Sequence, residues 1–181
     1  MIVNQFLQLF KEVCLNYIHS VLYHHQVYPS FVFEQRRTFN QINYFSKSPK
    51  LNDHLNSFID DVTKLLVKQQ LMEFKIVLMV DSTVYDIYTV EFTDIVHLAA
   101  KGDSQIDIPD DKVYRELNTF IYNHVNYLKS VRTREDTTFK LLLHTNAIDY
   151  SDSPSIDCHK VEVLDDVNLG VMNFNSTHRF N

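Results

Sequence analysis

Two prolines set the limits of the first two helices that this sequence can form. Apolar residues recur with helical spacing over residues 3–25, and Pro29 prevents that helix from continuing because it lacks a backbone N–H. Tyr28, just before it, is pushed toward extended geometry. A second amphipathic helix starts at Pro49, which suits a first helical turn and follows a serine N-cap. Residues 31–44 between them are therefore predicted to form an irregular strand or a hairpin.

The middle of the chain alternates strand and helix patterns. Residues 73–80 form a nearly continuous apolar run, which suits a central strand, and apolar side chains alternate along the returning segment 84–92. A third amphipathic helix is predicted over residues 109–128, with Tyr114 on its apolar face, and another strand over residues 137–145. Three helices on one antiparallel sheet, an α+β fold, is the simplest architecture for this order.

The character of the sequence changes at Asn146. Residues 146–157 are rich in Asp, Ser and Asn, and residues 161–164 form a brief strand-like run. The pattern after them is too weak to build a core and too apolar for a solvated tail. We therefore expect strands that complete the sheet edge of another chain. No repeat or linker is visible, so one domain spanning residues 1–181 is predicted.

Composition argues against several functional classes. The chain of 181 residues carries 23 acidic and 17 basic side chains, a formal charge of −6, so little direct nucleic-acid binding is expected apart from a local patch such as Arg132 with Arg134. Cys14 and Cys158 are too few for a disulfide framework or a Cys-rich zinc site. The N-terminus does not resemble a signal peptide, and no apolar run is long enough to span a membrane. A soluble intracellular protein is expected.

No catalytic machinery can be assembled from the sequence. With two glycines in the whole chain, neither a phosphate-binding loop nor a dinucleotide-binding turn is possible. The pair His24-His25 lacks a third metal ligand, and Cys158-His159 lacks an oxyanion pocket, so no metal site and no cofactor are predicted. Arg36-Arg37 is either an exposed strand face or a contact for an acidic partner. An unrelated small α+β enzyme is the alternative with the least support.

The collinear set of motifs resembles the HORMA domain over almost the whole chain. These motifs are VYPSFVF after the first helix, the Pro-x-Leu-Asn helix start, the paired apolar strands, and the closing strand TFKLLLHT. The first and last of them look like the Rev7 branch, the accessory subunit of the translesion DNA polymerase zeta. The stretch VYDIYTVEF lacks the Trp-containing motif usual in Mad2 relatives, which also favours Rev7.

This resemblance implies a non-catalytic adaptor that works in the nucleus. Residues 1–145 would form the core, and residues 146–181 a C-terminal "safety belt" that closes over a Pro-containing peptide of a partner and pairs on the far side of the sheet. The implied partners are the catalytic subunit of DNA polymerase zeta, through a Rev3-like peptide, a Rev1-like scaffold polymerase, and a second HORMA domain in a homo- or heterodimer. The alternative is a Mad2-like spindle-checkpoint adaptor or a meiotic HORMA adaptor.

The resemblance also implies which residues meet these partners. His54 stands where relatives use a tyrosine against the partner's proline, and Asn118, with Arg115 nearby, stands where related domains use an arginine to dimerise. Leu169 and Val171 are expected on a surface for the second partner. The residues expected to bind the partner peptide are His54, Phe58, Leu141, Leu143, Thr145, Ile148, Tyr150, Val161 and Val163.

Overall fold

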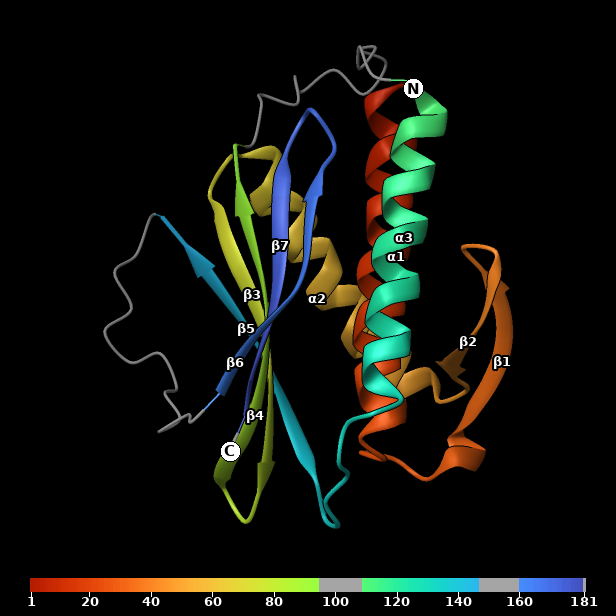
Figure 1. Ribbon diagram of the computed structural model, residues 1–181, viewed down its shortest axis with the longest axis vertical. Coiled ribbons are helices and arrows are strands. Elements are labelled where there is room, and N and C mark those ends of the chain that lie inside the picture. Colours follow the sequence, from red (N-terminus) through yellow and green to blue (C-terminus); the bar gives the residue numbers. More distant parts are fainter. Residues whose placement is uncertain (95–108, 147–159, 181) are drawn as a thin grey trace.

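The computed structural model describes residues 1–94, 109–146 and 160–180, and it has the α+β fold that the sequence predicted (Figure 1). The helices are α1 (Val3–His24), the short 3-10 helix η1 (Ser30–Val32), α2 (Pro49–Val67) and α3 (Asp110–Leu128). The strands are β1 (Phe33–Thr38), β2 (Gln41–Ser46), β3 (Leu71–Val80), β4 (Thr83–Thr93), β5 (Thr138–Thr145), β6 (Lys160–Asn168) and β7 (Asn173–Phe180). Five strands form an antiparallel sheet in the order β5-β3-β4-β7-β6, and β1 pairs with β2 as a separate hairpin.

The helix boundaries follow the signals in the sequence. Helix α1 ends ahead of Pro29, and α2 begins at the second proline. The Ser48 hydroxyl accepts a hydrogen bond from the Leu51 N–H at 3.5 Å, which caps α2. Asp110 and Asp111 place negative charge in the first turn of α3, where the helix dipole favours it. No helix among the described residues is long and apolar enough to cross a membrane.

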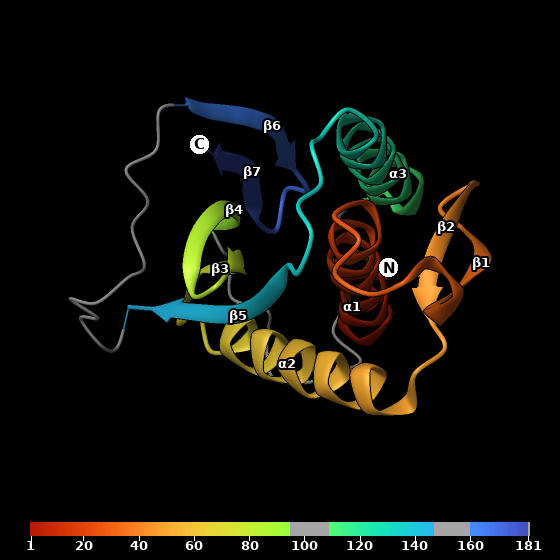
Figure 2. The ribbon, with the colours of Figure 1, turned by 90° about the horizontal axis from the view of Figure 1, so that it is seen from below.

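Helix α1 forms the centre of the core. It contacts α2, α3 and β2, and it lies between the five-stranded sheet and the β1–β2 hairpin (Figure 2). Phe10 meets Phe92 of β4 edge to face at 5.8 Å, and Tyr17 stacks on Phe120 of α3 at 5.6 Å. Burial of each such side chain contributes about 1.5–3 kcal/mol. The broad apolar arc predicted for this helix is confirmed, because elements cover α1 on several sides.

The C-terminal strands differ from the sequence-based expectation. They do not complete the sheet of another chain, as the sequence pattern suggested, because β7 pairs with β4 and β6 pairs with β7 in this chain's own sheet. This position on the far side of the sheet is the one that the resemblance implied. The side chains of β7 that point toward the helices are Phe174, Ser176 and His178, and all three are buried. Two of these three are polar, which is why the strand has no recognisable apolar pattern.

Buried hydrogen bonds hold the polar side chains of β7. The Ser176 hydroxyl lies 2.8 Å from the Tyr17 hydroxyl of α1. Nδ1 of His178 lies 2.7 Å from the Tyr127 hydroxyl of α3. The same imidazole stacks on Tyr88 of β4, with ring centroids 4.0 Å apart. Each of these groups would be costly to bury alone, so the partners make the position of β7 specific.

A second buried histidine joins this cluster from the end of α1. Nε2 of His25 lies 2.7 Å from the Tyr88 hydroxyl, and its Nδ1 lies 3.7 Å from one carboxylate oxygen of Asp86. Nε2 of His178 lies 3.6 Å from the other oxygen of the same carboxylate. Asp86 is therefore a buried acid flanked by two buried imidazoles, one from α1 and one from β7.

Burial favours the neutral form of several histidines. Desolvation lowers the pKa of His25 to about 4, although the Asp86 carboxylate acts in the opposite direction. Desolvation also lowers the pKa of His124, which stacks on Tyr17 at 3.8 Å, to about 3. The pKa of His19 falls to about 4 for the same reason, with a smaller effect from Arg36. In the unfolded chain each imidazole returns to a pKa of about 6.5.

We predict that acid destabilises this fold between about pH 6.5 and pH 4. In that window the unfolded chain binds protons at histidines that stay neutral in the folded chain, so the free energy of unfolding falls as pH falls. The change at His25 alone corresponds to about 3 kcal/mol. Urea denaturation at a series of pH values measures the effect.

A matched pair of variants tests whether buried histidines cause this dependence of stability on pH. His124→Phe keeps a ring against Tyr17 and removes one titrating group, so its stability should depend less steeply on pH in this window. Ser57→Ala changes an exposed residue of α2 that carries no ionisable group, so it should keep the wild-type dependence of stability on pH. Equal slopes for His124→Phe and the wild type would contradict the assignment.

Candidate functional site

Strand β5 is an edge strand with one side unpaired. Its backbone pairs with β3 from Leu71 to Met79, and no described strand pairs with its other side. Figure 2 shows β5 at the margin of the sheet beside α2. Leu141, Leu142 and Leu143 are half-buried, as expected for a strand with one side open. A free row of backbone N–H and C=O groups flanked by apolar side chains is a template for an added strand.

The two faces of β5 differ in chemistry. Phe139, Leu141 and Leu143 pack against the main core on the side of the helices. Leu142 points to the opposite face of the sheet, where it joins a small apolar cluster around Val77. On that face His144 Nδ1 lies 3.0 Å from Glu73, whose carboxylate also pairs with Lys75 at 2.6 Å.

Helix α2 and the segment after α1 supply aromatic rings at the helix side of this edge. The rings of His54 and Tyr28 each lie 6.3 Å from the ring of Phe139. Phe58, one turn further along α2, is half-buried and meets Phe74 of β3 at 6.1 Å. Tyr28, His54 and Phe139 form an apolar corner on the helix face of β5, within which His54 is exposed, whereas Phe58 packs under β3.

The structure brings together five of the residues that the resemblance assigned to the partner peptide. Leu141, Leu143 and Thr145 lie on β5, and His54 and Phe58 lie on α2, which contacts β5. These assignments remain predictions, because the geometry gives proximity and not binding.

Four other assignments to the partner peptide do not join this edge. Ile148 and Tyr150 lie outside the described residues. Val161 and Val163 lie on β6, with exposed fractions of 55% and 71%. Three strands separate β6 from β5, so these two valines cannot line one groove with Leu141. The tail pairs on the far side of the sheet, as the resemblance implied, and this position keeps the two valines away from the peptide edge.

The predicted surface for a second partner is buried. Leu169 is 0% exposed and Val171 8% exposed, and both belong to the main core. They lie in the turn between β6 and β7, where the Leu169 N–H donates to the Met172 carbonyl at 3.0 Å and Gly170 has φ 78°. This tight turn folds its apolar side chains inward, so they cannot form a contact surface in this conformation.

The predicted dimer surface lies on α3. Arg115 is exposed, and Asn118 is half-buried. Tyr114 and Tyr122 of the same helix are 49% and 59% exposed, so Tyr114 does not belong to the buried face on which the sequence placed it. Tyr114 lies at the boundary between the buried and the exposed face of α3. The spacing of apolar residues allows it on either face, so the sequence pattern could not decide between them.

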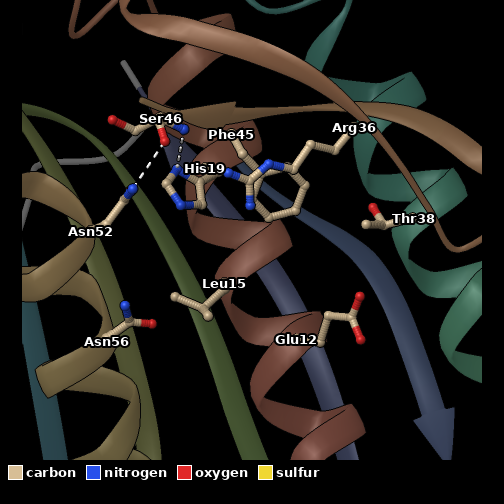
Figure 3. A pocket seen from close by; sticks show the side chains of 9 residues that line it. All are labelled: Glu12, Leu15, His19, Arg36, Thr38, Phe45, Ser46, Asn52 and Asn56. Atoms are coloured by element: carbon tan, nitrogen blue, oxygen red, sulfur yellow. Dashed lines mark hydrogen bonds between the residues drawn. The ribbon is translucent and has the colours of Figure 1, made fainter. Parts of the chain in front are cut away.

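A separate cavity of about 240 Å³ lies between α1, α2 and the β1–β2 hairpin (Figure 3). The Ser46 N–H donates to Nδ1 of His19 at 3.4 Å, and the Asn52 amide donates to the Ser46 carbonyl at 3.0 Å. The Arg36 guanidinium lies 5.4 Å from the centre of the Phe45 ring. These contacts join α1 and α2 to the hairpin, so the cavity is better explained by hairpin docking than by a ligand.

The described parts of the chain contain no candidate metal site. Across residues 1–94, 109–146 and 160–180, no three His, Cys, Asp or Glu side chains come close enough to hold a metal ion. Cys14 is buried, and desolvation raises the pKa of its thiol far above the ordinary value, so it is a poor nucleophile.

The whole chain is similar in structure to several solved proteins. No family model matches the sequence, and no curated protein matches it. Among solved structures, a chain of the mitotic checkpoint complex is 12% identical with a TM-score of 0.81, covering 98% of this chain and 99% of that chain. C. elegans HTP-2 bound to the HIM-3 closure motif is 12% identical with a TM-score of 0.75, covering 99% and 93%. HTP-2 bound to HTP-3 motif-6 is 13% identical with a TM-score of 0.73, also covering 99% and 93%.

The TM-scores establish a shared fold, and the identities are too low to establish a shared function. They support the resemblance to the HORMA domain without distinguishing its Rev7 branch. The element order, the five-stranded sheet and the near-complete coverage of both chains lead to one conclusion. This chain has the HORMA fold.

Proposed function

We propose that this chain is a non-catalytic adaptor that captures an extended segment of a partner protein at the free side of β5. The observation that carries the proposal is an unpaired edge strand with half-buried leucines beside an aromatic corner. Backbone hydrogen bonds to β5 would supply much of the contact, and the side chains on its two faces would supply specificity. HTP-2 in complex with a closure motif is a structural precedent.

The topology favours closure of the C-terminal segment, residues 146–181, over such a guest. All neighbouring strands are antiparallel, so β5 and β6 run in the same direction, and they lie at opposite edges of the sheet (Figure 2). The chain must therefore cross about 19 Å of sheet and return about 26 Å along the strands. Residues 146–159 can reach roughly 45 Å, which exceeds the direct path of about 32 Å. The difference in length is sufficient for this connection to pass outside one strand added to β5.

A belt of this kind makes release slow. Opening it requires the β6–β7 hairpin to leave β4, which breaks the β4–β7 backbone ladder and the buried contacts of His178 and Ser176. Such an opening is a local unfolding event with its own free-energy cost. Dissociation of the guest should therefore be limited by the belt and not by the contacts of the guest alone.

The partner is the less constrained part of the proposal. The motifs VYPSFVF and TFKLLLHT favour a segment of the catalytic subunit of DNA polymerase zeta, with a Rev1-like polymerase and a second HORMA domain as further partners in the nucleus. The solved neighbours come from the mitotic checkpoint complex and from HTP-2, so the alternative, a checkpoint or meiotic adaptor, fits the fold equally well.

Co-expression separates these two classes of partner. We predict that the full chain co-purifies with Pro-containing fragments of a polymerase zeta catalytic subunit in preference to checkpoint or meiotic closure motifs. A pull-down followed by mass spectrometry measures this. Recovery of checkpoint or meiotic proteins without polymerase subunits would transfer the assignment to the alternative.

The position of the binding edge has a separate test. His54→Asp places a carboxylate in the apolar corner beside Phe139, so capture of the partner fragment should weaken by about tenfold, as for a moderate hot spot. Its stability should change by less than about 0.5 kcal/mol, because His54 is exposed. The matched control Val163→Asp adds the same charge at the opposite edge, on β6, and should bind normally. Equal binding by both variants would remove β5 as the site.

Deletion of residues 146–181 tests the belt. We predict that the shortened chain loses the slow phase of partner dissociation and fails to co-purify. Because Phe174 and His178 are buried, circular dichroism must first show that the shortened chain folds. If it does not fold, acceleration of release by His178→Ala in the full chain is the replacement measurement. Unchanged dissociation in a folded variant would argue against a belt.

A further inference from the structure

The two faces of β5 carry information about the sequence of the guest strand. The side chains of a strand alternate between faces, so a guest paired with β5 must match the helix side and the open side at alternate positions. On the helix side, Phe139, Leu141 and Leu143 pack against the core and leave part of their surface open. Guest residues opposite these three positions should therefore be apolar.

On β5 itself, the open side carries one charged side chain without an ion pair to a described residue. Lys140 lies opposite Val77 in the pairing with β3, so its side chain shares the open face with Leu142 and His144. Lys75 on the same face pairs with Glu73 at 2.6 Å, and His144 contacts the same carboxylate at 3.0 Å. Lys140 is exposed and forms no ion pair with a described residue. It is thus a cation on a binding edge with its charge uncompensated.

Resting on the proposed function, we infer that the guest is an acidic-apolar segment with a carboxylate directly opposite Lys140. Directly opposed side chains in paired strands have Cβ atoms about 4.5–5.5 Å apart, close enough for an ion pair, and a like charge there is unfavourable. Leu142 is half-buried beside the apolar cluster, so the guest residue opposite it is apolar. The five guest positions opposite residues 139–143 therefore comprise one acid and four apolar residues.

The position of the acid within the motif reports the direction of the guest. Lys140 is the second of the five facing residues, so a guest parallel to β5 carries its acid second among the five, and an antiparallel guest carries it fourth. The two motifs are mirror images, and a selected sequence therefore identifies the orientation without a structure of the complex.

An edge lysine has a simpler explanation, which is protection against edge-to-edge aggregation. Under that explanation Lys140 needs no acid in the guest, and changing its sign leaves guest preference unaltered. The two explanations make opposite statements about peptide selection, so one experiment decides between them.

The experiment selects random linear peptides from a displayed library on the full chain, on Lys140→Glu and on the control Lys47→Glu. Lys47 is exposed in the connection after β2, so its variant matches the change in net charge away from β5. We expect Asp or Glu at one fixed position on the wild type and on the control, and Lys or Arg there on Lys140→Glu, with the apolar positions unchanged. A selected acidic peptide should bind Lys140→Glu about two- to fivefold more weakly, and high salt should reduce the difference.

The outcomes separate this inference from the proposed function. Selected peptides that lose binding in His54→Asp but show no charge preference, or the same preference on Lys140→Glu, would overturn the acidic motif and leave the β5 edge in place. Peptides whose binding is indifferent to His54→Asp would overturn the proposed site itself.

Discussion

Pairing of β7 with β4 is the interaction on which an open binding edge depends. The sheet has two edges, and the C-terminal strands occupy the one beside β4, which leaves the outer side of β5 unpaired. If the same strands paired with β5, they would fill the position that we assign to a guest. Residues 160–180 therefore have two roles: they complete the sheet beside β4, and by pairing there they leave β5 free to accept a strand.

The buried polar cluster gives this pairing its specificity. Apolar contacts alone specify which face of β7 is buried, but they discriminate less against a shift of two residues along β4, which keeps the same face inward. His178 and Ser176 instead require Tyr127 and Tyr17, and a shift of register would leave these groups buried without partners. The same cluster makes the state sensitive to acid through His25, because burial lowers the pKa of its imidazole to about 4.

The helices, the central strands and the α+β class were predictable because their signals are local. Proline, a serine cap and the spacing of apolar residues fix α1, α2 and α3 without reference to distant residues. The pairing of β7 with β4 was not predictable from the pattern of the tail, and only the resemblance implied it, because it depends on contacts such as Tyr17 with Ser176, 159 positions apart in the sequence. Leu169 and Val171 illustrate the same limit: an apolar residue in a turn suits either a surface or a core, and only the path of the chain decides.

A shared fold does not name a partner, and the structure explains why. The backbone of β5 offers the same hydrogen bonds to any extended segment, so the sheet order is compatible with every guest that the proposal allows. Discrimination must come from side chains that stand along that backbone: the rings of His54, Tyr28 and Phe139 on one face, and Lys140 on the other. At 12–13% identity these positions are free to differ between chains of one fold, so the identity of the partner follows from their chemistry and not from the architecture.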